Sequence, residues 1–140
     1  MIKICFVCTG NTCRSIMAER LMKKTLKQKK IDNVKIISRG LNANGEMITE
    51  NAKKILKKLN ASAVNRKSIK LGKINKDTLY VTMTEKQKNQ IKSNKVISFN
   101  SLIGNEILDP FGYDEEVYYQ VALDIQKGID ILINKINMWR

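Results

Sequence analysis

Apolar and polar residues follow two alternating patterns along this 140-residue chain. Short runs that are almost entirely apolar are typical of strands buried on both faces of a parallel sheet. Four such runs predict strands, at Ile2–Val7, Val34–Ser38, Leu79–Met83 and Val96–Phe99.

The segments between these runs carry apolar residues at the three- and four-residue spacing of a helix. They predict helices from Ser15 to about Lys30, from about Met47 to Asn60, over Glu85–Lys92 and from Asp114 to about Ile136. The other segments are predicted to be loops: Leu41–Glu46, the irregular and basic stretch Ala61–Lys73, and Ser101–Tyr113, which holds the only proline.

Strands that alternate with helices indicate βαβ units with right-handed crossovers. We therefore predict an α/β fold in a single domain over residues 1–140, with a four-stranded parallel sheet and helices on both faces. In such folds, ligands bind beyond the carboxyl ends of the strands. The segment directly after the first strand is therefore the first candidate for a functional site.

The stretch Cys8–Ser15 joins the first predicted strand to the first predicted helix. It is a short polar turn with one glycine, and backbone N–H groups in such a turn converge on its centre. The positive end of the helix dipole adds to the attraction for an anion. The pattern therefore predicts a phosphate-binding loop after the first strand, formed by Thr9, Gly10, Asn11, Thr12, Cys13, Arg14 and Ser15.

Two residues give this loop more than an affinity for anions. Cys8 opens it, where a thiolate beneath converging N–H groups is a nucleophile aimed at phosphorus. Arg14 closes it, where a guanidinium can hold two phosphate oxygens. The nucleotide-binding motifs G-x-x-x-x-G-K-[ST] and G-x-G-x-x-G need a lysine and glycines that are missing here. A plain loop with an incidental cysteine is the alternative.

A second catalytic residue is needed, because the group that leaves phosphorus must be protonated. The chain has no histidine, so a carboxyl group is the natural acid, and Asp109 in the loop after the fourth strand is the best candidate. Pro110 keeps Asp109 out of helical backbone, and we expect Phe111 to line the pocket and shield Asp109 from water. Asp77 and Asp114 are rivals, and Asp109-Pro110 could also simply start a turn.

The three cysteines, Cys5, Cys8 and Cys13, all lie in the first thirteen residues. An odd number so closely clustered does not fit a secreted disulfide framework. A metal site would need a fourth ligand, and there is neither a histidine nor a further cysteine to supply it. We expect no metal and no cofactor, and we expect Cys5 to be a small apolar residue of the first strand.

The chain carries a formal net charge of +13 at pH 7, from 26 basic and 13 acidic residues. The basic residues are scattered, aromatic residues make up only 6%, and no nucleic-acid motif appears, so we expect no nucleic-acid partner. The excess charge instead favours the steering of anionic substrates, or simply covers solvated faces. No apolar run approaches the length of a membrane span and no secretory leader is evident, so we expect a cytoplasmic protein without a membrane partner.

The segment Val7–Ser15, followed by Met17-Ala18-Glu19, resembles the low-molecular-weight protein-tyrosine-phosphatase family. Ser38-Arg39-Gly40, Asp77 with Val81–Thr84, and Asp109-Pro110 extend the resemblance over nearly the whole chain. It implies Cys8 as nucleophile, Arg14 as phosphate clamp, and Asp109 as general acid and then base. It also implies that Ser15 donates a hydrogen bond to the Cys8 thiolate and that Asn11 braces the loop.

Within the family, the chain is most similar to the bacterial protein-arginine phosphatases. Those enzymes share Thr-Gly-Asn-Thr in the loop, whereas tyrosine phosphatases usually carry an aliphatic residue where Thr12 stands. Pro110-Phe111-Gly112 also lacks the paired aromatic residues that commonly follow Asp-Pro in tyrosine enzymes. The related arsenate reductases use further cysteines downstream, and none follows Cys13.

Two departures from the family pattern are visible in the sequence. Ile16 replaces a frequent proline at a position where proline is favourable but dispensable. The stretch Asn65–Ser68 lacks the histidine that many members carry there, so no role is transferred to it.

The sequence therefore predicts a cysteine-dependent, metal-independent phosphatase that acts through a cysteinyl-phosphate on phosphorylated proteins. Phosphoarginine is the expected substrate, and a low-molecular-weight protein-tyrosine phosphatase is the alternative. A phosphate-binding or redox-sensing module without turnover is the alternative from a different class. We expect a monomer.

Overall fold

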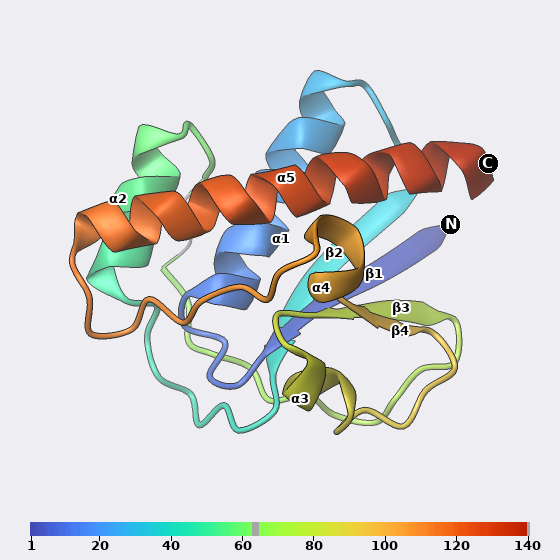
Figure 1. The fold of residues 1–140 in the computed structure, drawn as a ribbon, viewed down its shortest axis with the longest axis horizontal. Helices are drawn as coiled ribbons and strands as arrows, with labels where there is room; N and C mark the ends of the chain where they lie inside the picture. Colours follow the sequence, from blue (N-terminus) through green and yellow to red (C-terminus); the bar gives the residue numbers. More distant parts are fainter. Residues whose placement is uncertain (63–64, 140) are drawn as a thin grey trace.

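The computed structural model describes residues 1–62 and 65–139 and shows an α/β fold built on one parallel sheet (Figure 1). The strands lie in the order β2-β1-β3-β4, and every neighbouring pair is parallel. Both the fold class and the four strands predicted from the apolar runs are confirmed. The strands are β1 (Ile2–Cys8), β2 (Val34–Gly40), β3 (Thr78–Thr82) and β4 (Val96–Ser98).

The four predicted helices are present with shifted ends, and the structure adds a short fifth helix. The helix predicted from Met47 begins only at Glu50, because Thr49 is its N-cap and accepts a hydrogen bond from the Ala52 N–H at 3.4 Å. A one-turn helix stands at the start of the predicted 101–113 loop and ends at Gly104, whose φ is +80°. The helices are α1 (Arg14–Gln28), α2 (Glu50–Lys58), α3 (Glu85–Lys88), α4 (Asn100–Ile103) and α5 (Glu115–Trp139).

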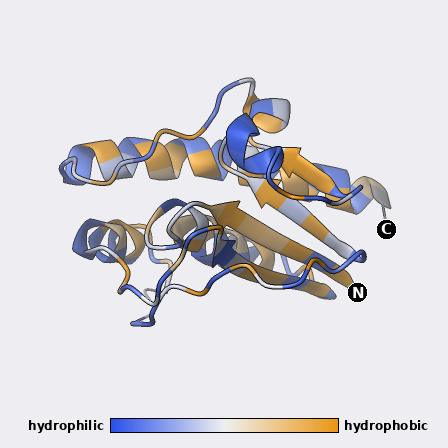
Figure 2. Ribbon diagram, turned by 90° about the horizontal axis from the view of Figure 1, so that it is seen from below, coloured by the Kyte–Doolittle hydropathy of each residue, from blue (hydrophilic) through white to orange (hydrophobic). Residues whose placement is uncertain are grey.

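The sheet is buried on both faces, which explains its nearly continuous apolar runs. On β1, Ile4 and Phe6 belong to the main core that α1, α2 and α5 complete. Cys5 and Val7 point to the opposite face, into a smaller cluster with Ile91, which follows α3. Figure 2 shows the resulting pattern, with mostly hydrophobic strands between helices that carry both kinds of residue.

The long helix α5 packs across the main core and contacts α1, α2 and α4. Its Gly128 leaves room for the ring of Phe99, which a Cβ at this position would strike. Within residues 1–62 and 65–139, neither α5 nor any other helix combines the length and the apolar character needed to cross a bilayer.

Candidate active site

The Cys8–Ser15 loop turns tightly at the carboxyl end of β1 and leads straight into α1. The Cys8 Sγ lies 2.9 Å from the Ser15 Oγ and accepts a hydrogen bond from the Asn11 N–H at 3.2 Å. Asn11 has a φ of +56°, a left-handed conformation that asparagine tolerates better than most residues. The turn therefore bends backbone and hydroxyl groups around the sulfur, at the positive end of the α1 dipole.

The end of β2 packs against the first residues of this loop. A Cβ at Gly40 would lie 2.8 Å from the Thr9 carbonyl oxygen and 2.9 Å from the Asn11 nitrogen, so only glycine lets the two segments approach. The Leu41 N–H also donates to the Cys8 carbonyl oxygen at 2.9 Å. Gly40, the last residue of β2, therefore lets this strand end pack closely against the loop.

Two helices hold the loop from its sides. The Thr49 N–H, at the start of α2, donates to the Thr12 carbonyl oxygen at 3.0 Å. The Gln87 side chain of α3 donates to the Thr9 Oγ1 at 3.1 Å. Since β1, β2, α2 and α3 all contribute, contacts with the rest of the fold support the turn that the loop makes by itself.

Arg14 connects the loop to the segment that contains Asp109. Its side chain is buried, donates from Nη1 to the Ile107 carbonyl oxygen at 2.9 Å, and places Nη2 3.7 Å from the Asp109 Oδ2. The two predicted catalytic regions therefore meet at the same edge of the sheet, although they lie almost a hundred residues apart in the chain.

The structure corrects the expectation for Phe111. Its side chain is 67% exposed and the Asp109 side chain is 55% exposed, so Phe111 does not shield Asp109 from water. The reason is a turn after Pro110, closed by a 2.9 Å hydrogen bond from the Tyr113 N–H to the Pro110 carbonyl oxygen. The Asp109 Oδ1 instead accepts the Phe111 N–H at 3.1 Å and lies 3.9 Å from the Cys13 Sγ.

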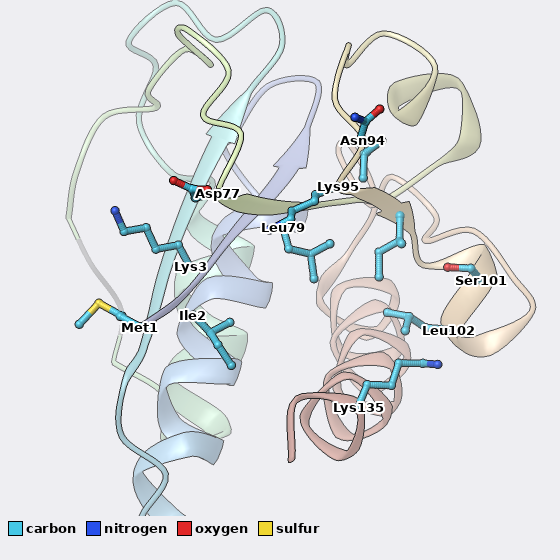
Figure 3. Close-up of a pocket in the computed structure, with 12 residues that line it drawn as sticks. Met1, Ile2, Lys3, Asp77, Leu79, Asn94, Lys95, Ser101, Leu102 and Lys135 are labelled. Atoms are coloured by element: carbon cyan, nitrogen blue, oxygen red, sulfur yellow. The ribbon is translucent and has the colours of Figure 1, made fainter. Parts of the chain in front are cut away.

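The rival carboxylates occupy other places. Asp114 accepts a hydrogen bond from the Val117 N–H at 3.2 Å, at the start of α5. Asp77 lies among the residues that line a cavity of about 700 Å³ (Figure 3). That cavity is bounded by the beginnings of β1, β3 and β4 together with α4 and α5, so it lies at the edge of the sheet opposite Cys8. Asp77 is therefore far from the loop and Asp114 caps α5, whereas Asp109 lies beside Arg14 and Cys13.

The two other cysteines are held as thiols. Burial raises the pKa of the Cys5 thiol to about 12. Burial, together with the neighbouring Cys8 and Asp109, raises the pKa of the Cys13 thiol to about 11. Both side chains are therefore protonated at neutral pH, and Cys5 is a small buried residue of β1, as predicted.

A buried polar cluster lies behind the loop, formed by Asn11, Ser38 and Glu19 together with the half-buried Arg66. Neither Arg66 nor Glu19 was assigned a role from the sequence. Glu19 stood in a motif quoted for the family resemblance, but Arg66 lies in an irregular segment without periodicity. No local signal could have connected the two residues.

Comparison with known proteins agrees with this geometry. Residues 3–139 match the family model described as "Low molecular weight phosphotyrosine protein phosphatase". A protein-arginine-phosphatase from Geobacillus stearothermophilus is 34% identical, over 96% of this chain and 95% of the relative. The low molecular weight protein-tyrosine-phosphatase PtpA of Staphylococcus aureus is 30% identical, over 99% of this chain and 98% of the relative.

A solved structure is similar over nearly the same length. It is a cysteine-to-serine variant of the YwlE arginine phosphatase with a phosphorylated active-site serine, with a TM-score of 0.84 and 28% identity over 97% of this chain and 96% of that one. The family resemblance inferred from the Cys8–Ser15 motif is confirmed, and the chain belongs to the low molecular weight phosphotyrosine protein phosphatase family.

Proposed function

We propose that this chain is a protein phosphatase that removes phosphate from phosphoarginine in proteins, through a phosphocysteine at Cys8. The observation that carries the proposal is the environment of the Cys8 Sγ, which faces the Asn11 N–H and the Ser15 hydroxyl at the N-terminus of α1. The relative whose active-site serine, in place of cysteine, carries a phosphate supports the same position as the point of phosphoryl transfer.

The proposed reaction has two steps. In the first, the Cys8 thiolate attacks phosphorus, the bond from phosphorus to the leaving nitrogen breaks, and Asp109 gives that nitrogen a proton. In the second, water attacks the phosphocysteine, the ionised Asp109 takes a proton from the water, and phosphate leaves while the thiolate is restored. The charge that develops on phosphate is stabilised by preorganised donors, which we assign to Arg14 and the backbone of Thr9, Gly10, Asn11, Thr12, Cys13 and Ser15.

The exposed position of Phe111 suggests how this predicted substrate-binding residue contributes to the reaction. Phe111 is exposed directly after Asp109 and Pro110, where a substrate protein must approach. We therefore propose that it contacts the polypeptide of the substrate rather than the reacting group. The cytoplasmic location, the monomeric state and the lack of a nucleic-acid partner stay predictions from the sequence.

The alternative substrate is phosphotyrosine, which the Staphylococcus relative and the family name favour. The discriminating experiment is a comparison of kcat/KM for phosphoarginine and phosphotyrosine on one purified sample. A larger value for phosphoarginine supports the proposal. A larger value for phosphotyrosine would replace the proposed function with the alternative, and no turnover of either substrate would favour a binding module.

Thr12 is the residue that we expect to decide between these substrates. A phosphoarginine guanidinium has several N–H donors, and leaving one of them unpaired against an aliphatic wall costs about 1–3 kcal/mol. Thr12→Ile should therefore lower kcat/KM for phosphoarginine relative to phosphotyrosine by roughly 5- to 150-fold. The Thr49 N–H holds the backbone of Thr12 at 3.0 Å, and this contact does not depend on the Thr12 side chain.

Thr12→Ser is the matched control, because it keeps the hydroxyl and removes only a methyl group. It should retain the substrate ratio of the native chain. If Thr12→Ile lowers both activities equally, Thr12 supports the loop geometry and has no part in selecting phosphoarginine.

Cys13 is expected to protect Cys8 from irreversible oxidation. Peroxide converts the Cys8 thiolate to a sulfenic acid, and attack by the Cys13 sulfur then forms a disulfide and releases water. A dithiol should restore the peroxide-treated native chain, whereas Cys13→Ser should stay largely inactive. Because the raised pKa keeps Cys13 a thiol at neutral pH, its attack should become faster as the pH increases. Full recovery of activity in Cys13→Ser would contradict the protective role.

A further inference from the structure

The cavity of about 700 Å³ at the amino ends of the strands has no part in the proposed reaction (Figure 3). Its volume falls within the range of about 300–1,000 Å³ that is typical of small-molecule sites. We propose that this cavity binds a small amphipathic anion, a molecule with an apolar chain and one acidic head group such as a carboxylate. The inference goes beyond the proposed function and does not depend on it.

The floor of the cavity is apolar. Ile2 on β1, Leu79 on β3 and Ile97 on β4 all pack against the main core, and each of them is only partly buried. Leu102 of α4 adds a further apolar side chain beside them (Figure 3). Each CH₂ group of a ligand that leaves water for such a surface strengthens binding by up to about fourfold. The floor therefore favours an apolar chain.

The rim of the cavity carries an excess of positive charge. Lys3, Lys95 and Lys135 are exposed residues that line it, and Asp77 is the one carboxylate among the described lining residues. None of the three lysines forms an ion pair with a carboxylate within residues 1–62 and 65–139. An acidic head group at the rim meets this charge and keeps its contact with water, so it avoids the cost of burying an ion.

The position of the cavity separates its ligand from the phosphate-binding loop. The strand β1 begins at Ile2, which lines the cavity, and ends at Cys8, which opens the loop. A molecule in the cavity therefore leaves the loop open, and phosphate in the loop does not displace it. Three strands and two helices bound the cavity, which suits one small molecule better than an extended polypeptide.

The probe is decanoate, added to the full chain below the concentration at which it forms micelles. Titration calorimetry measures its Kd and stoichiometry, and amide chemical-shift mapping by NMR locates it. We expect one molecule to bind per chain, with the largest shifts around Ile2, Leu79 and Leu102. Hexanoate, which is shorter by four CH₂ groups, should bind about 10- to 200-fold more weakly. Decyltrimethylammonium, which carries the opposite charge on the same chain, should not shift these residues.

Three charge variants test the rim. Lys135→Glu should raise the Kd of decanoate by about 5- to 30-fold, because an attractive charge becomes a repulsive one. Asp77→Asn should lower it by about 2- to 5-fold, because a repulsive charge is removed. Lys127→Glu is the matched control, since it makes the same change on α5 outside the cavity and should leave the Kd unchanged. All three residues are exposed, and thermal unfolding confirms that each variant is folded.

Three results would overturn the proposal. Equal weakening by Lys135→Glu and Lys127→Glu would show that the net charge of +13 attracts the probe without a site. Shifts confined to Cys8–Ser15 and abolished by saturating phosphate would place decanoate in the catalytic loop instead. Binding to vesicles of anionic phospholipid without binding of free decanoate would replace the small ligand with a membrane surface. No turnover is needed, so a failure of the proposed function leaves these measurements unaffected.

Discussion

Cys8→Ser should lower kcat by more than about 10³-fold, because removing a nucleophile that works as one unit with its neighbours costs at least this much. A serine hydroxyl is far less nucleophilic than a thiolate and is a poorer leaving group from phosphorus. In the similar YwlE variant the active-site serine carries a phosphate, which indicates that the reaction of Cys8→Ser would stop after the first phosphoryl transfer. The variant should therefore take up one phosphoryl group slowly, which mass spectrometry detects, and turn over no further.

Phosphate or vanadate binding should survive in Cys8→Ser, because the loop backbone and Arg14 form the cradle. Isothermal calorimetry measures this directly. Cys5→Ala is a suitable control, since it removes a buried thiol from the same strand but from its other face. Residual turnover above one part in about 10³ in Cys8→Ser would exclude Cys8 as the nucleophile.

Asp109→Asn should slow substrates with poor leaving groups by about 10²- to 10⁴-fold, the usual contribution of a general acid. The rate at which nitrophenyl phosphate phosphorylates Cys8 should fall much less, because its leaving group hardly needs a proton. The position of Asp109 supports this expectation, since its carboxyl is partly exposed and lies beside both Arg14 and Cys13. The measurement is kcat/KM for phenyl phosphate and nitrophenyl phosphate in the same preparation.

Asp77→Asn provides the comparison for this experiment. It makes the same chemical change at the opposite edge of the sheet, so both substrates should react as in the native chain. If Asp109→Asn slows both substrates equally, Asp109 holds Arg14 or the loop in place and another group supplies the proton.

The sequence alone was enough to predict the elements whose residue pattern is local. The run Ile2–Val7 predicted a buried strand because both faces of β1 are covered, and the residue types from Cys8 to Ser15 predicted a phosphate-binding loop. Asp109 could be named as a candidate because Pro110 restricts its backbone and the chain has no histidine, and the structure places it beside Arg14 and Cys13. These features depend on neighbours in the chain.

The sequence was insufficient for features that depend on contacts between distant segments. Phe111 is exposed because the chain turns after Pro110, and no pattern in the sequence predicted the hydrogen bond that closes this turn. The helix α2 begins late because Thr49 caps it, and Thr49 also holds Thr12. Arg66 meets Glu19 across 47 positions of sequence, and only the tertiary fold brings them together.

The hydrogen bond between Arg14 and the Ile107 carbonyl has a consequence for the newly synthesised chain. It joins residues 93 positions apart, so the proposed nucleophile and phosphate clamp leave the ribosome long before the segment that contains Ile107. Contacts of such long separation close late in folding, because the chain must first lose the entropy of a large loop. A nascent chain therefore carries the proposed nucleophile without the complete site, and we expect hydrolytic activity only after the segment that follows β4, with Ile107 and Asp109, has docked.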